Sequence, residues 1–297
     1  MAIIHDSPDA RRAAVLAAPP FLYAVLLLAL PLAAIVVISF WSQSGLDLDR
    51  SPTAANFREV FSGPIYIWGN ERRWGVLPLS LFVSATVTLV TILLAYPVAY
   101  FVSFHVSPAR KSLWLFLITI PFWTSYLIRV FLWKVILGFN GVVNTALVSL
   151  GILSEPSEAL LYNLNSVVIS LSHAYVVFAI LPIFVSLEKI DRSLLEASQD
   201  LGENRLTTFL RVTLPLSVPG IVGAVLIVFI PVTGDYVTPE LMLGAGGRLM
   251  SNVIQSQFLQ LNNWPLGAAL AIVMMIAVGL CALLFVALNR RWLRGRS

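Results

Sequence analysis

The stretch LPLSLFVSATVTLVTILLAYPVAYFVSF at Leu77–Phe104 decides the fold class of this chain. It contains no Asp, Glu, Lys or Arg and is almost wholly apolar. A helix of this length crosses the hydrocarbon core of a bilayer, which is about 30 Å thick, because each helical residue rises about 1.5 Å. Charged groups in that core are costly, so this stretch predicts a membrane-spanning helix.

Five further stretches have the same character, and the composition of the whole chain agrees with them. The 297 residues are 58% hydrophobic and 11% charged, which excludes a water-soluble domain and a nucleic-acid binder. The single cysteine, Cys281, excludes an intrachain disulfide. The sequence therefore predicts an all-α membrane protein with six transmembrane helices. The other five are expected at Phe21–Phe40, Leu113–Gly138, Ser166–Leu187, Leu216–Val232 and Leu266–Leu288.

Positive charge is shared unevenly between the two sets of loops. Twelve Lys and Arg residues fall on one side and five on the other, where four of the five are mixed with acidic residues in the first loop. Because cytoplasmic loops are the richer in Lys and Arg, both termini are expected in the cytoplasm. The twelve are Arg11, Arg12, Arg110, Lys111, Lys189, Arg192, Arg205, Arg211, Arg290, Arg291, Arg294 and Arg296, and the five are Arg50, Arg58, Arg72, Arg73 and Arg248.

Two of the six spans have individual features. The first is longer than the hydrophobic region of a signal peptide, about 7–15 residues, and no small-residue cleavage site precedes Ser42, so it is expected to be an uncleaved helix. The fifth is the shortest and contains Pro219, Gly220, Gly223 and Pro231. These residues predict a broken helix, which a membrane tolerates where neighbouring helices or a cavity satisfy the freed backbone groups. A pore-lining or gating position is one interpretation.

Motifs of energy-converting and catalytic proteins are missing from the sequence. There is no G-x-x-x-x-G-K-[ST] phosphate loop, no G-x-S-x-G and no H-E-x-x-H. His5, His105 and His173 have no second ligand at metal spacing. We therefore expect a non-catalytic chain that binds no cofactor or metal of its own, in which His173 packs between helices.

The longest and most charged inside loop is Glu188–Pro215, between the fourth and fifth spans. It is predicted to form two short helices, because Asp191 is a suitable N-cap and Gly202 a suitable left-handed C-cap residue. The second helix is expected to run until Leu214-Pro215.

The first of these helices is amphipathic. An apolar stripe favours a protein partner or the membrane interface over a plain connector. Glu196 is spaced to pair with Arg192 at i,i+4, or to close a capping box with Ser193. The stripe consists of Leu194, Leu195, Ala197 and Leu201.

The same loop carries a family resemblance. Glu196-Ala197-Ser198, three residues, Gly202, nine residues and Val212-Thr213-Leu214-Pro215 resemble the EAA motif of ATP-binding-cassette (ABC) importer permeases, although Ser198 replaces the usual second Ala and Val212 the usual Ile. The resemblance implies a type I ABC importer permease fold, in which this segment is the coupling helix seated in a cleft of an ATPase subunit. The coupling residues that it implies are Glu196, Ala197, Ser198, Gly202, Leu214 and Pro215.

The resemblance extends over roughly Leu77–Asn289 and is to spermidine/putrescine permease subunits. It rests on Ala95–Phe104, Pro121–Leu137, Ser186–Ser198, Tyr236–Gly244 and Asn263–Ala269, while Lys134 stands where an uncharged residue is usual. It divides the chain into an amino-terminal segment with the first helix and an outside loop at 1–76, a five-helix permease core at 77–289 with its coupling loop at 188–215, and a basic cytoplasmic tail at 290–297.

The resemblance also implies partners and a mechanism. They are a second permease, two cytoplasmic ATPase subunits that bind the ATP and Mg, and a periplasmic substrate-binding protein, all at a bacterial inner membrane. ATP binding would switch the permeases between inward-facing and outward-facing states as rigid bodies.

A polyamine is a polycation, so its path should offer carboxylates and aromatic faces. Asp235, Tyr236 and Glu240 follow the fifth span in a segment rich in turn residues, where the alternative is a solvated loop. Trp123 and Tyr126 in the third span share a helix face at i,i+3, although packing is an alternative role for both. These five residues are the candidates for a substrate path or gate.

Arg129 is an intramembrane cation, which must face the bundle interior, a carboxylate or a carbonyl because facing lipid is costly. Since a cation repels a cationic substrate, we expect a structural or permease–permease interface role for it. Lys134 is expected to reach the outer interface near Gly138.

Two alternatives to a polyamine permease stay open. An importer of the same class for another small organic solute would share the coupling loop and lack the carboxylate path. A secondary transporter would need inverted repeats or intramembrane ion ligands, and neither is visible in the sequence.

Overall fold

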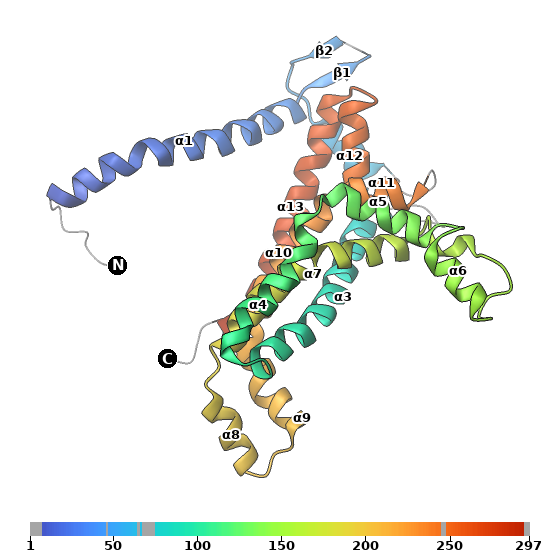
Figure 1. Ribbon diagram of the computed structural model, residues 1–297. Helices are drawn as coiled ribbons and strands as arrows, with labels where there is room; N and C mark the ends of the chain where they lie inside the picture. Colours follow the sequence, from blue (N-terminus) through green and yellow to red (C-terminus); the bar gives the residue numbers. More distant parts are fainter. Residues whose placement is uncertain (1–7, 46, 64–65, 67–74, 245–247, 294–297) are drawn as a thin grey trace. The chain divides into compact units, whose positions relative to one another are not determined.

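The computed structural model describes residues 8–45, 47–63, 66, 75–244 and 248–293, and the elements keep the labels of Figure 1. In this part of the chain, six helical segments are long and apolar enough to cross a membrane. The expected number of spans is confirmed. The segments are Val15–Ser39, Val76–Phe104, Tyr126–Ser149, Leu164–Glu188, Arg205–Gly234 and Trp264–Leu288. Several residues named from the sequence lie outside the described part: His5, Arg72, Arg73, Arg294 and Arg296.

The chain forms helices almost throughout the described residues. The longer helices are α1 (Pro8–Ser39), α3 (Val76–Phe104), α7 (Leu164–Glu188), α10 (Leu214–Gly234) and α13 (Trp264–Leu288). The shorter ones are α2 (Ala55–Ser62), α4 (Pro108–Thr119), η2 (Ile120–Trp123), α5 (Tyr126–Leu137), α6 (Val142–Ser149), η3 (Glu158–Leu160), α8 (Arg192–Asp200), α9 (Arg205–Thr208), η4 (Phe209–Thr213), α11 (Val237–Met242), α12 (Met250–Leu259) and α14 (Arg290–Leu293). The strands β1 (Ser42–Ser44) and β2 (Asp47–Asp49) pair antiparallel, with Ser42 opposite Asp49.

Two compact units make up the chain, and the first consists of Met1–Ser62 and Ser256–Val273. Within it, Gln43 of β1 donates from Nε2 to the Asn262 carbonyl (2.5 Å) and accepts from the Trp264 amide (3.2 Å). Within this unit the apolar stretch of α1 is not buried, as expected of a helix that lipid or a partner protein surrounds. The boundary predicted after residue 76 stays a prediction.

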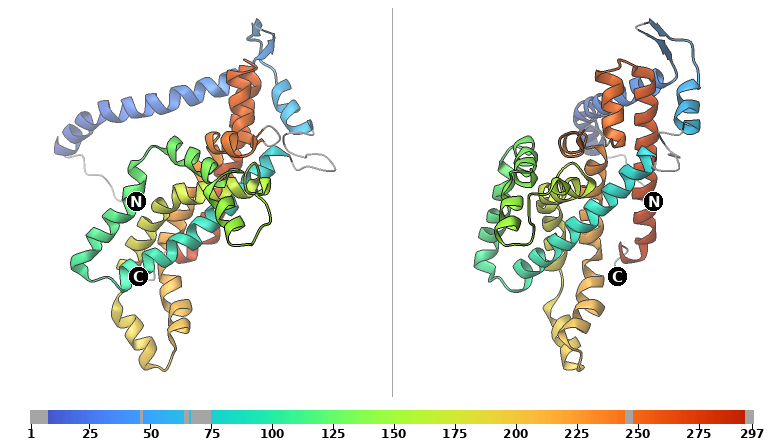
Figure 2. Two further views of the ribbon diagram at one scale, coloured as in Figure 1. Left: turned by 45° about the vertical axis from the view of Figure 1, so that its right-hand side comes forward. Right: turned by 90° about the vertical axis from the view of Figure 1, so that its right-hand side faces the viewer.

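The second unit consists of Gly63–Gln255 and Met274–Ser297, and its centre is a bundle of α3, α7 and α10 that pack side by side (Figure 1 and Figure 2). The uncharged spans form this core because each buries aliphatic side chains, such as Val87, Leu171 and Val228, against the other two. Buried hydroxyls on α3 donate to carbonyls four residues earlier, as Thr91 does to Val87 at 2.7 Å. Such local bonds satisfy polar groups away from water.

The third span differs from its predicted range, Leu113–Gly138. Leu113 belongs to α4, and the α-helix is interrupted at Ile120–Ser125 by a single 3₁₀ turn followed by two extended residues. Pro121 explains the end of α4, because proline has no amide hydrogen to continue the helix ladder. The membrane-length segment begins at Tyr126 instead and includes α6.

The fifth span is a continuous helix, so the expectation of a break was wrong. It runs through α9, the π-helical turn η4 and α10 over Arg205–Gly234, and it is among the longest spans. Pro219 and Pro231 lie inside α10 without ending it. Gly220 lies directly against α7: a Cβ added there would stand 2.4 Å from the Ser186 Cβ and 2.6 Å from the Pro182 carbonyl. The glycine therefore allows α7 and α10 to pack closely and does not break the helix.

Candidate coupling hairpin and substrate path

The loop after α7 folds into a hairpin of α8 and α9 that extends away from the bundle (Figure 1). Asp191 begins α8, because its Oδ1 accepts from the Ser193 amide at 3.0 Å. This bond holds the pKa of the exposed Asp191 carboxyl below its ordinary value. Gly202 ends the first arm with φ +87°, a left-handed conformation that favours glycine, and Asn204 begins α9 by accepting from the Thr207 amide. The presence of two helices in this loop and the predicted roles of Asp191 and Gly202 are confirmed.

One side-chain contact joins the two arms of this hairpin, and a second joins its turn to η4. The hydroxyl of Ser198 on α8 lies 3.1 Å from that of Thr208 on α9. Glu203 accepts from the Arg211 guanidinium at 2.6 Å. Ser198 therefore has a partner that the alanine usual in the motif would lack, which gives this departure from the family pattern a physical reason.

The predicted polar contacts of Glu196 are not formed. Arg192 lies 3.5 Å from Glu188, one turn earlier, rather than against Glu196. The N-cap is Asp191, so Ser193 and Glu196 do not close a capping box. Glu196 itself is exposed. Its carboxylate is thus left at the surface, where a partner would meet it.

The apolar stripe of the hairpin is largely uncovered. Leu195 packs against the core of the bundle, but Leu201 is 86% exposed and Leu206 on the second arm 66% exposed. Leu194 and Leu210 are also exposed. Several large apolar side chains on one projecting hairpin are typical of a protein-binding surface.

Leu214 and Pro215 join the hairpin to the fifth span. The predicted helix end at Leu214-Pro215 was wrong, because the helix continues through both residues into α10. The Leu214 amide donates to the Phe209 carbonyl, the i to i−5 pattern of a π-turn. Pro215 follows where the ladder already departs from the α pattern, so its missing amide is accommodated. The second arm and the span are therefore one continuous helical rod.

At the other end of α10, Asp235 is the centre of a second cluster. Its Oδ1 accepts from the Val237 amide at 2.9 Å and so caps α11, while its Oδ2 accepts from the Tyr126 hydroxyl of α5. The same hydroxyl lies 2.6 Å from Thr238. Two of the predicted path residues, 109 positions apart in the chain, are thus in direct contact.

The other two predicted residues of this segment belong to a neighbouring network. Glu240 accepts from the Asn252 side chain at 3.1 Å, and the same amide donates to the Tyr236 carbonyl at 2.8 Å. The ring of Tyr236 is exposed, and Val237–Met242 is helical rather than a loop. Ser251 donates to the Asp235 carbonyl at 2.7 Å. Sequence reasoning missed Ser251 and Asn252, although polar residues at the start of α12 were a visible signal.

Trp123 does not share a helix face with Tyr126, so that prediction was wrong. It lies on η2, ahead of the break in the third span, and is 74% exposed. Its ring contacts Phe116, with centroids 5.8 Å apart. The structure thus brings Tyr126 to Asp235 and leaves Trp123 at the surface.

Arg129 is buried in the bundle, in agreement with the expectation that it faces the interior. Its Nη1 donates to the Ala174 carbonyl at 3.5 Å, and its Cζ lies 5.5 Å from the centroid of the Phe122 ring. Lys134 approaches the ring of Tyr162 at 5.8 Å. His173 packs against Trp133 with centroids 5.4 Å apart. Among the described residues, no three His, Cys, Asp or Glu side chains gather as metal ligands would.

These features define a multi-span α-helical membrane protein with a projecting two-helix hairpin. The chain belongs to the family of binding-protein-dependent transport system inner membrane components, whose sequence profile matches residues 65–295. The resemblance to importer permeases is therefore confirmed.

Individual relatives agree with the family. The chain is 35% identical over 274 residues to the spermidine/putrescine transport system permease protein PotB of Haemophilus influenzae, with 91% of each chain covered. It is 39% identical over 210 residues to PotB of Escherichia coli, covering 71% of this chain and 76% of that one. A chain of a bacterial ABC transporter for the import of alginate superposes with a TM-score of 0.66 over 95% of this chain and 97% of that one, at 18% identity, which shows the shared fold.

Proposed function

We propose that the chain is a permease subunit of an ABC importer for polyamines, in a bacterial inner membrane. The observation that carries the class is the hairpin, which exposes Glu196, Leu201 and Leu206 around the left-handed turn at Gly202, in a chain of the binding-protein-dependent family. Such a surface fits a cleft in a cytoplasmic ATPase subunit. The coupling residues are Glu196, Ala197, Ser198, Gly202, Leu214 and Pro215.

Energy for transport then comes from the partners. Two ATPase subunits bind the ATP and Mg, a periplasmic binding protein delivers the substrate, and a second permease completes the path. This chain supplies the coupling surface and half of the path, without chemistry or a cofactor of its own. A structural neighbour is a chain of a bacterial alginate ABC transporter in complex with an alginate pentasaccharide-bound periplasmic protein, and this supports the proposed assembly.

The polyamine assignment is supported by the relatives named as spermidine/putrescine permeases and by Asp235. Its carboxylate is half-buried beside the Tyr126 hydroxyl, so an ammonium group would find both a charge and an aromatic partner there. Tyr236 and Glu240 continue this path, while Trp123 contributes an exposed ring elsewhere. Arg129 is assigned a structural role.

The test is uptake of labelled putrescine and spermidine by vesicles that contain the chain with its ATPase, second permease and binding protein. Asp235→Asn is the decisive variant, because the amide oxygen still caps α11 while the charge is lost. Uptake should fall while hydrolysis stimulated by the binding protein persists. Glu158→Gln, an exposed carboxylate at the start of η3, is the control and should leave uptake unchanged.

A second candidate substrate is another small organic solute. Hydrolysis stimulated only by a binding protein of different specificity, with no polyamine uptake, would keep the coupling hairpin and discard the cation path through Asp235.

A further inference from the structure

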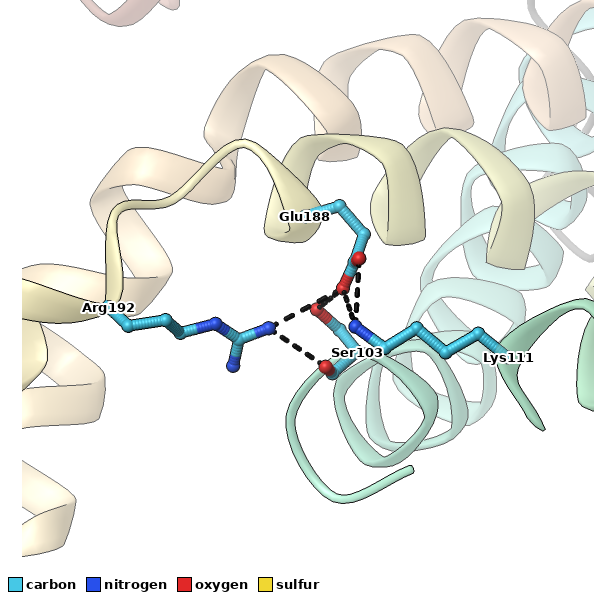
Figure 3. A network of polar contacts seen from close by, with 4 residues as sticks. All are labelled: Ser103, Lys111, Glu188 and Arg192. Carbon is cyan, nitrogen blue, oxygen red and sulfur yellow. Dashed lines mark hydrogen bonds and ion pairs between the residues drawn. The ribbon is translucent and has the colours of Figure 1, made fainter. Parts of the chain in front are cut away.

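Four polar side chains meet where α3, α4, α7 and α8 come together (Figure 3). The Glu188 cluster consists of Ser103 near the end of α3, Lys111 in α4, Glu188 at the end of α7 and Arg192 at the start of α8. Neither the motif of the hairpin nor the proposed path uses these residues.

Glu188 is the hub of the cluster. Its carboxylate accepts from the Lys111 ammonium with both oxygens, at 2.7 and 2.8 Å, and from the Ser103 hydroxyl at 2.6 Å. Lys111 is only 16% exposed and Glu188 31%. Charge-assisted bonds in such a half-buried place are stronger and more directional than those of a fully exposed ion pair.

Arg192 connects the cluster to the hairpin. Its Nη2 donates to the Ser103 carbonyl at 2.8 Å and lies 3.5 Å from Glu188, while its Cζ stands 3.9 Å from the centroid of the Phe104 ring. The first residue of α8 is thereby fixed to the last turn of α3. No residue of α8 is fully buried, so this contact is a main attachment of the arm to the bundle.

We propose that Glu188 is a positioning residue for energy coupling, which makes α8 move together with the α3–α4 corner through Lys111, Ser103 and Arg192. The proposal rests on the proposed function, since it describes how motion of the hairpin reaches the spans. Apolar contacts allow helices to slide past one another, whereas a hydrogen-bonded charge network holds one geometry. A link of this kind transmits displacement instead of absorbing it.

The test compares Glu188→Gln, Lys111→Met and the double variant in the assembled transporter, reconstituted in vesicles. Each single variant leaves one charge of the Lys111–Glu188 pair without its partner, whereas the double variant removes both charges of the pair. Thermal stability should therefore fall in the single variants and recover in the double one. Substrate transported per ATP hydrolysed should fall roughly 2- to 30-fold in all three, because the link is absent in each.

Recovery of transport per ATP together with stability in the double variant would show a merely structural role and overturn the proposal. Glu155→Gln, an exposed carboxylate outside the cluster, is the matched control.

A distance measurement keeps this test independent of transport. Spin labels at the exposed positions Arg110 and Gln199, in a Cys281→Ser background, report the position of α8 relative to α4. The distribution should broaden in Glu188→Gln and stay unchanged in Glu155→Gln. If the unaltered complex shows no ATP hydrolysis in response to a binding protein, the proposed function fails. The label distances test the link separately, because an unchanged distance distribution in Glu188→Gln would refute it.

Discussion

Gly202 shows how one residue shapes the candidate coupling surface. Its φ of +87° is a left-handed conformation, and a Cβ added there would meet nothing within 4 Å in the described chain. The glycine is thus required by the backbone of the turn and not by space within the subunit. A residue with a side chain costs about 1–2 kcal/mol in this conformation, and Asn tolerates it best.

We therefore expect Gly202→Asn to retain most ATP-dependent transport and Gly202→Val to lose it, because a β-branched residue resists positive φ. Uptake and stimulated hydrolysis measured in the reconstituted transporter check this order. Equal loss in both variants would show instead that a partner subunit occupies the space beside Gly202.

Residues whose role depends on local chemistry were predictable from the sequence. Asp191 and Gly202 were predictable because caps and left-handed turns depend on local chemistry. The contact between Tyr126 and Asp235 was not, since it joins residues 109 positions apart and depends on how α5 packs. The pairing of Arg192 with Glu188 in place of Glu196 likewise depends on the position of α3, which the loop sequence does not contain.

At the scale of elements, the contact between α7 and α10 depends on Gly220. Gly220→Ala should destabilise the protein by about 1–3 kcal/mol, because its Cβ would overlap Ser186 and the Pro182 carbonyl. Thermal unfolding in detergent measures the effect. Gly223→Ala is the matched control on the same helix. Its Cβ would lie 3.7 Å from the Pro182 Cβ, an ordinary contact, so its melting temperature should equal that of the unaltered protein.

The first turn of α8 should respond to pH through its cap. The pKa of Asp191 is lowered from 3.8 by the Ser193 amide that donates to it. The charged cap therefore stabilises the folded turn fully above the unfolded pKa, and this contribution is lost as the pH falls through the lower, folded pKa.

Hydrogen exchange of the α8 amides, compared with their intrinsic rates, should show faster opening of this turn as the medium is acidified through that range. Asp191→Asn is the control, because an asparagine caps the helix without titrating. An identical pH response in both proteins would mean that the cap is not the titrating group.

Prolines mark where element prediction from sequence succeeded and failed. Pro121 ends the helix before the third span, whereas Pro219 and Pro231 lie within α10. The residue type is the same, but inside α10 the neighbouring helices of the bundle hold the chain helical. Hydropathy located the spans, and only the packing around each proline decides whether its helix continues.

At the scale of the whole molecule, the distribution of Lys and Arg predicts the direction of insertion. The hairpin should lie in the cytoplasm with both termini, and α2 on the opposite side. In a Cys281→Ser background, Gln199→Cys should react with an impermeant thiol reagent only from the cytoplasmic face. Glu59→Cys, exposed on α2, should react only from the outer face. Labelling of position 199 from the outer face would overturn the assignment of the hairpin as a coupling surface, and labelling of position 59 from the cytoplasmic face would overturn the predicted placement of α2.

The close approach at Gly220 has a mechanical consequence. One arm of the hairpin leaves the end of α7, and the other runs without interruption into α10, so both arms are rooted in helices whose backbones touch. Close-packed interiors are nearly incompressible. A force on the tip of the hairpin is therefore not expected to separate α7 from α10. It would act on the two helices together as a torque. We therefore expect the hairpin to rotate α7 and α10 as one unit, because the absence of a side chain at Gly220 lets the two helices pack in direct contact.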